Sequence, residues 1–215
     1  MATDQETWAL VHAERARIAD LFDSFTETQW ETMSLCRGWS VKLCAAHIMA
    51  SGEQTAPRFM TSLLANGFRF NVMIDRAAHR LGQLETKEII RRLRDRTTTT
   101  NKAPAPVVAV LGEVVVHGSD IRLPLGIVDN VAPAAKIASL NSFTSSNFPV
   151  PTKRIIEGLS LRATDLEWSF GQGPEVAGPS QSLLLAMTGR SAGLRALEGE
   201  GLETMSARHS KSAVS

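Results

Sequence analysis

Apolar residues near the N-terminus recur at helical spacing. The steps of three, four and seven predict an amphipathic helix over about residues 4–25, with its apolar face formed by Trp8, Val11, Ile18, Phe22 and Phe25. Thr3 or Asp4 can cap its start. A loop at residues 36–39 then precedes Ser40, which is a plausible N-cap for a second helix running toward Asn66-Gly67. Pro57 is expected to kink or interrupt that helix.

A third helix is predicted to begin at Thr86, with Ile89, Ile90 and Leu93 on its apolar face. Threonines at 97–100 and the prolines that follow them predict a linker before residue 107. The next segment, 107–117, is rich in valine, which favours a strand. Its apolar steps and Pro106 at a helical first turn favour a helix instead. Propensity alone leaves the choice between helix and strand open.

The pattern changes after residue 126. Pro133 opens a short predicted helix through Leu140, and the prolines near residue 150 predict a boundary. Beyond it, apolar residues alternate with polar ones over 159–164 and again over 166–170, which predicts two strands. Pro179 opens a helix that ends at Gly189, and the last ten or so residues are expected to be disordered. The sequence thus predicts a mainly α fold: a helical domain over residues 1–150 and a small α+β domain over residues 151–215.

Composition excludes several classes of function. The net charge of +1 gives no reason to expect nucleic acid or an anionic membrane as a partner. Charged residues interrupt the N-terminal segment, so we do not expect it to be a signal peptide. No segment is apolar for long enough to span a bilayer. Two cysteines, Cys36 and Cys44, are too few for a disulfide framework. We therefore expect a cytoplasmic protein.

One carboxylate stands out among apolar residues. Glu113 lies in the valine-rich segment four residues before His117, and His47 lies in a second apolar segment. A buried carboxylate is costly unless something compensates its charge, and a metal ion can do so. On a helix, Glu113 and His117 would stand about 5–6 Å apart on one face, whereas on a strand they would be ~13 Å apart. A shared metal ion therefore requires that residues 106–121 form a helix.

His47 is the best candidate for a third ligand. Two imidazoles and a carboxylate leave coordination positions open, which is typical of catalytic zinc sites and also fits a facial-triad iron site. An alternative is a sulfur-containing zinc site in which Cys44 joins His47, with Cys36 as a further ligand. Asp120, three residues after His117, is a candidate for orienting a ligand imidazole or for a fourth ligand. A local ion pair with Arg122 would explain Asp120 equally well.

Three segments resemble one family of proteins. They are 35–47, with Cys36, Gly38, Trp39 and His47; 113–126, with Glu113, His117 and Asp120; and 161–190, with Asp165, Trp168 and Arg190. In this order they are similar to the actinobacterial mycothiol-dependent maleylpyruvate isomerase-like proteins of the DinB/YfiT-like superfamily. The resemblance extends from about residue 6 to residue 205.

The resemblance implies a DinB-like four-helix bundle followed by a small C-terminal domain. It also implies a divalent metal, usually zinc, held by His47, Glu113 and His117. Arg190 would match an arginine that some members place near the metal, and could bind an anionic group. Members often carry an aspartate four residues before the first histidine, where this chain has Leu43, so the surroundings of that ligand are expected to differ.

The expected function is that of a mycothiol-utilising enzyme. A metal-bound thiolate would attack a small electrophilic substrate, as an S-transferase or a cis–trans isomerase. Two alternatives remain on the same scaffold: a thiol-independent metal-dependent hydrolase or lyase, and a non-catalytic stress or binding protein. The sequence leaves the electrophile and the oligomeric state open.

Overall fold

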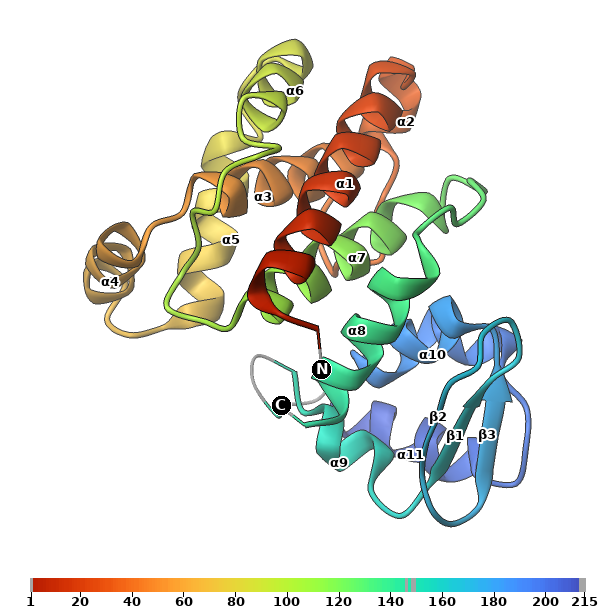
Figure 1. Cartoon of the computed structure of the whole chain (residues 1–215). Helices are drawn as coiled ribbons and strands as arrows, with labels where there is room; N and C mark the ends of the chain where they lie inside the picture. The colour runs from red at the N-terminus through yellow and green to blue at the C-terminus, as the bar shows by residue number, and fades with distance from the viewer. Residues whose placement is uncertain (1, 146, 148–149, 213–215) are drawn as a thin grey trace. The chain divides into compact units, whose positions relative to one another are not determined.

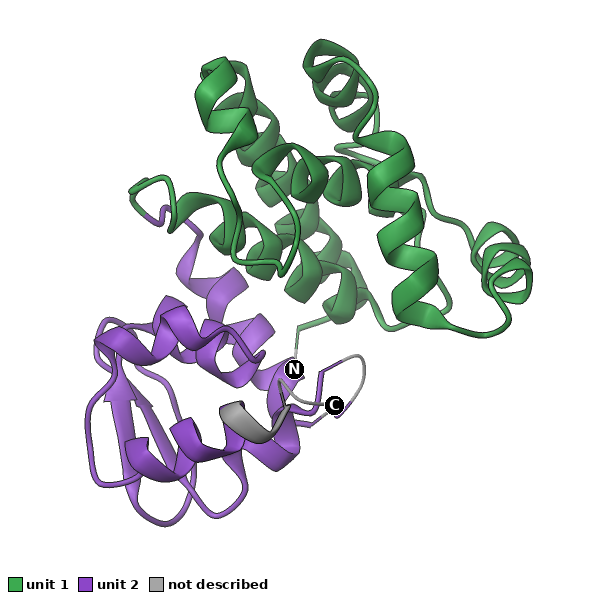
Figure 2. Cartoon of the chain, turned by 180° about the vertical axis from the view of Figure 1, so that it is seen from behind, with its two compact units in different colours: residues 1–128 green, residues 129–215 purple. Residues whose placement is uncertain are grey.

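The computed structural model describes residues 2–145, 147 and 150–212. These residues fold as two compact units, residues 1–128 and residues 129–215, which are drawn in different colours in Figure 2. The units divide earlier in the chain than the predicted boundary after residue 150, because the helix that begins at Pro133 packs with elements that come later in the chain. The chain therefore consists of a larger N-terminal unit and a smaller C-terminal one.

The first unit consists of helices, drawn from red to green in Figure 1. Their bounds are α1 Asp4–Asp23, α2 Glu27–Glu31, α3 Val41–Glu53, α4 Ala56–Ala65, α5 Phe70–Leu81, α6 Thr86–Arg94 and α7 Val107–Arg122. Helix α1 packs against α6 and α7, and α3 packs against the same two helices. These four helices therefore form the predicted four-helix bundle, while α5 adds to α3.

Caps explain where the predicted helices begin. Thr3 forms a capping box with Glu6 at the start of α1, and the Ser40 hydroxyl accepts from the amide of Leu43 at the start of α3. The predicted long second helix is interrupted: α3 ends at Glu53, and α4 begins as a separate helix with Pro57 in its first turn. Helix α5 was not predicted, because it buries only two residues, Met73 and Ala78, and so carries a sparse apolar stripe.

The valine-rich segment is a helix. Residues Val107–Arg122 form α7, and most of its side chains are buried against the neighbouring helices. Tertiary packing therefore overrides the preference of valine for strands. The helical alternative, on which the shared metal site depends, is confirmed.

The second unit contains a three-stranded sheet and further helices. The strands are β1 Ser160–Ala163, β2 Ser169–Gly171 and β3 Glu175–Gly178, in the order β2-β1-β3. Strand β1 pairs antiparallel with β2 and parallel with β3. The helical elements are α8 Pro133–Thr144, α9 Thr152–Ile156, α10 Ser180–Met187, the 3-10 helix η1 Ser191–Ala196 and α11 Leu202–Ser212. The mainly α fold with a small C-terminal α+β unit is confirmed, although β3 was not predicted.

The prediction of a disordered tail is wrong for most of its length. Helix α11 spans Leu202–Ser212, and its Met205 is fully buried. The apolar pattern did not predict this helix, because most of its residues are small or polar and few of its side chains are apolar. The end of the predicted tail, residues 213–215, lies outside the described residues. Across the described ranges, none of the helices combines the length and the apolar character needed to cross a membrane.

Candidate metal centre

Helix α7 carries two of the three predicted ligands on one face. Glu113 and His117 are one turn apart, as the helical alternative requires. Their helix packs against α3, which carries His47. Nε2 of His47 lies 3.3 Å from Oε1 of Glu113. The rings of His47 and His117 meet edge to face, with centroids 4.8 Å apart. The three side chains therefore converge from two packed helices.

The Glu113 carboxylate lacks full compensation of its charge. Its side chain keeps 28% of its exposure, but Oε1 is buried and forms no hydrogen bond with any described residue. Burial raises the pKa of Glu113, and the charge of His117, a hydrogen bond from Ser51 and the charge of Arg15 oppose this rise. An orphaned carboxylate oxygen beside two imidazoles is the environment that a divalent cation would satisfy.

Arg15 is a buried cation that was not among the predicted site residues. It is fully buried on α1, and its Nη1 donates to the carbonyl oxygens of Thr99 at 3.0 Å and Arg96 at 3.4 Å. Its Nε and Nη2 find no hydrogen-bond partner among the described residues. Burial lowers the pKa of Arg15, and the negative charge of Glu113 opposes this change. The signal was present in the sequence, since Arg15 occupies the apolar stripe of α1 between Val11 and Ile18.

Asp120 contacts the other side of the His117 ring. Its Oδ2 lies 2.9 Å from Nδ1 of His117, and the aspartate is fully buried. Burial alone would lower the pKa of His117, but hydrogen bonds with Asp120 and Cys36 raise it to about 10. With Nδ1 donating to Asp120, Nε2 is the nitrogen left to face a ligand. Asp120 thus contacts His117, and its role in orienting a ligand imidazole stays a prediction.

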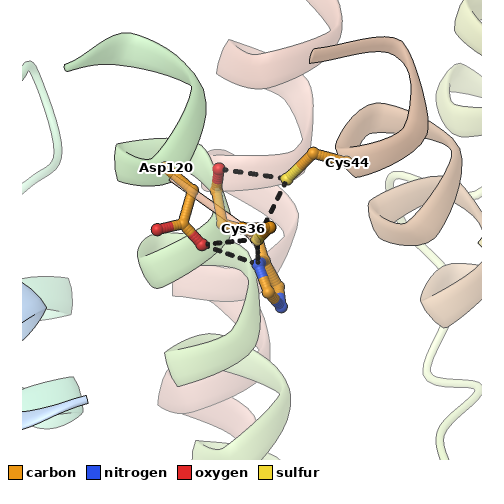
Figure 3. A group of neighbouring side chains, drawn as sticks. Cys36, Cys44 and Asp120 are labelled. Carbon is orange, nitrogen blue, oxygen red and sulfur yellow. Dashed lines mark hydrogen bonds and ion pairs between the residues drawn. The ribbon is translucent and has the colours of Figure 1, made fainter. Parts of the chain in front are cut away.

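The two cysteines join this contact rather than His47. Figure 3 shows Cys36, Cys44 and Asp120 pointing toward one another. Sγ of Cys36 lies 3.0 Å from Oδ2 of Asp120, 3.4 Å from Nδ1 of His117 and 4.0 Å from Sγ of Cys44. Cys36, Cys44, His117 and Asp120 each offer one ligand atom, and these atoms lie within 4.8 Å of one another. The four residues therefore form a second group with the spacing of a metal site. The predicted alternative joined the cysteines to His47, whereas this group joins them to His117 and Asp120.

The protonation of Cys36 is unusual. Its pKa is lowered to about 6, chiefly by a hydrogen bond from Cys44 and also by His117, while burial and the charge of Asp120 act in the opposite direction. As a thiol, Cys36 donates to Asp120. As a thiolate, it accepts from Cys44 and His117. The cysteine therefore exchanges its partners when it loses its proton.

The remaining predicted residues make other contacts. Arg190 belongs to the second unit, where its Nη1 donates to the carbonyl oxygen of Thr188 at 2.8 Å; its role toward an anionic substrate stays a prediction. Leu43 packs against the end of α5, so closely that a Cβ at Gly82 would lie 2.4 Å from its Cδ2. Position 43 therefore supplies apolar packing.

The chain is similar to known proteins in sequence and in fold. Residues 11–110 match the model of the mycothiol maleylpyruvate isomerase N-terminal domain, a range that includes His47 and ends before Glu113. A solved structure of a mycothiol-dependent maleylpyruvate isomerase superposes with a TM-score of 0.60 at 14% identity, covering 93% of each chain.

A histidine-to-alanine mutant of a mycothiol-dependent maleylpyruvate isomerase superposes with a TM-score of 0.61 at 13% identity, again over 93% of each chain. At such identities the likeness shows a shared fold. No curated protein matches the chain in sequence. The similarity in sequence thus covers residues 11–110, a little under half of the chain, and is to the mycothiol maleylpyruvate isomerase N-terminal domain.

Proposed function

We propose that this protein is a metal-dependent enzyme that uses mycothiol to act on a small electrophilic substrate, as a cis–trans isomerase or an S-transferase. His47, Glu113 and His117 are the proposed ligands of a divalent cation, with zinc as the first to test. The observation that carries the proposal is the buried Oε1 of Glu113, which lacks a hydrogen bond and lies 3.3 Å from His47. The family match over residues 11–110 supports the thiol.

Each side chain has a distinct task in this proposal. Glu113 supplies negative charge, which partly offsets the cation and removes the cost of its own burial. His47 and His117 supply neutral nitrogens, and His117 must give up its second proton to do so. Asp120 accepts from Nδ1 of His117 and so directs Nε2 toward the cation. A cation held there would lower the pKa of a thiol and polarise a neighbouring carbonyl.

The two reaction types share the addition of the thiol and differ in the fate of the adduct. If the thiol adds to a cis double bond, rotation about the new single bond and elimination of the thiol yield the trans isomer and regenerate the thiol. If the adduct is released instead, the thiol is consumed and the reaction is an S-transfer. The substrates named for the matched structures support testing isomerisation first.

Elemental analysis and activity test the proposal together. The full chain, purified without chelator, is expected to bind one divalent cation and to turn over an electrophilic substrate only when mycothiol is present. His47→Ala should lose both the cation and the activity. His79→Ala is the matched control, because His79 is half exposed on α5 and should keep both.

Three results would count against the proposal. A His47→Ala variant that keeps the cation and the thiol-dependent activity would remove the site. Turnover without any thiol would favour the metal-dependent hydrolase or lyase. A wild-type chain without cation and without turnover would favour a binding or stress protein.

A further inference from the structure

Two sulfur atoms lie close together beside the candidate metal centre. Sγ of Cys36 and Sγ of Cys44 are 4.0 Å apart, and the proposed reaction needs neither of them. We infer that Cys36 and Cys44 form a dithiol–disulfide pair that reacts with low-molecular-weight disulfides. This thiol chemistry does not require a bound metal, and it can be measured on the metal-free protein.

The geometry requires only a small movement. A disulfide bond is about 2.05 Å long, so the two sulfurs must approach by ~2 Å. Cys44 is held within α3, whereas Cys36 lies in the loop between the bridged residues Met33 and Ser40. Gly38 in that loop has a φ of +79° and open space around it. The Cys36 amide donates to Ser34 and its carbonyl accepts from Trp39, so rotation of the Cys36 side chain is the movement required.

The two thiols differ in exposure, which sets the order of reaction. Cys44 is completely buried, whereas Cys36 is partly exposed and is followed by exposed Arg37 and Gly38. An external disulfide can reach Cys36 before Cys44. Cys36 is thus the attacking thiol, and Cys44 is the thiol that resolves the intermediate.

The exchange takes place in two balanced steps. Cys36 loses its proton and attacks one sulfur of the external disulfide, which forms a mixed disulfide and releases one thiol that takes up the proton. Cys44 then loses its proton and attacks Sγ of Cys36, which releases the second thiol. The two cysteines are oxidised by two electrons, and the external disulfide is reduced to two thiols. Short-lived disulfides of this kind are typical of redox sensing rather than of structural stabilisation.

Oxidation changes what Asp120 contacts. As a thiol, Cys36 donates its S–H to Oδ2 of Asp120, and as a thiolate it accepts from Nδ1 of His117, which contacts the same oxygen. A disulfide sulfur has neither the proton nor the negative charge, so oxidation removes the first contact and weakens the second. The redox state of the cysteine pair therefore changes the contacts of Asp120, the residue proposed to orient His117.

Mass spectrometry of the full chain tests the inference. Reduced wild-type protein is incubated with glutathione disulfide as the probe, in its native state and in urea, where the reagent is expected to reach both thiols. The native protein should lose the mass of two hydrogen atoms and keep no adduct. Trypsin should then release peptides 18–37 and 43–58 as one linked species that separates on reduction. The ring NMR signals of His117 should change on oxidation.

Two variants form the matched controls. Cys44→Ser lacks the resolving thiol and should keep a glutathione adduct on Cys36. Cys36→Ser retains only the buried thiol and should remain unmodified in the native state. The inference is overturned if native wild-type protein keeps a stable adduct or stays reduced. It is also overturned if Cys36→Ser reacts as fast as Cys44→Ser, or if oxidation leaves the His117 signals unchanged.

Discussion

Oδ2 of Asp120 lies 2.9 Å from Nδ1 of His117, one helical turn earlier on the same buried face of α7. This contact fixes the plane of the imidazole and assigns its two nitrogens to different partners. It therefore provides a direct way to test whether His117 is a ligand without altering His117 itself.

Replacing Asp120 with asparagine should weaken metal binding. An asparagine keeps the size of the side chain but accepts a weaker hydrogen bond, so the ring is less firmly oriented and less basic. We expect a loss of about 10–100-fold in affinity, measured by competition with a chromophoric chelator. Asp165→Asn is the control, because Asp165 caps Ser180 in the second unit and should affect stability without affecting affinity. Equal affinities of Asp120→Asn and wild-type protein would contradict the orienting role.

Replacing Glu113 with glutamine should stabilise the metal-free protein. Burial raises the pKa of this carboxyl above its ordinary value of 4.5. The stability that the neutral form confers is thus present below about pH 4.5 and is lost as the pH rises through the raised pKa. Glutamine mimics the neutral form, so the midpoint of thermal unfolding at pH 7 should rise without metal. Added zinc should stabilise the wild type but not the variant, and a metal-free variant less stable than wild type would refute this account.

Arg15 and Glu113 should be coupled in stability. Arg15→Met removes a positive charge that favours the ionised Glu113, so it should cost more in the wild-type background than beside Glu113→Gln. A double-mutant cycle in urea should give a coupling of roughly 0.5–3 kcal/mol. Arg91→Met is the control, because Arg91 is 60% exposed and forms its ion pairs with the nearby Glu88 and Asp95. Its cost should be small and the same in both backgrounds, and additive costs for Arg15 and Glu113 would show that the two charges act independently.

His209 should make the second unit sensitive to acid. Burial lowers its pKa below the ordinary value of 6.5, and a contact with the carbonyl oxygen of Ala186 only partly opposes this. Because the folded pKa is depressed, its contribution to stability is complete above about pH 6.5 and is lost as the pH falls through the lowered pKa. Thermal unfolding of wild-type protein and His209→Gln between pH 8 and pH 5 measures the difference. The wild type should lose more stability on acidification, and parallel curves would exclude the effect.

The sequence predicted the bundle better than it predicted the small unit. Periodic apolar residues and side-chain caps located α1 and α3 because these helices bury a full stripe. Helix α5, strand β3 and helix α11 were missed, since each of them buries few side chains or is very short. Local patterns carry little information where stability comes from contacts that are distant in the chain.

The contacts of the candidate site were also predicted only in part. The spacing of four residues associated Glu113 with His117, because on a helix both side chains come within reach of one ion. It did not associate Arg15 with Glu113, or Cys36 with His117 and Asp120, because those contacts join different elements. A charged residue within an apolar stripe, as Arg15 is, was the one local sign of them. The role of the three residues as metal ligands stays a prediction.

The valine-rich composition of α7 bears on the order of two events, the packing of this helix and the binding of an ion. Valine has low helix propensity, and isolated helices of this length are marginal in water. Glu113 and His117 therefore come within reach of one ion only when α7 packs against α1 and α3. A nascent chain that has not yet closed the bundle offers no such pair of donors. If these residues hold a cation, its loading follows closure of the bundle, and chain synthesis in chelated medium should still yield the folded apoprotein.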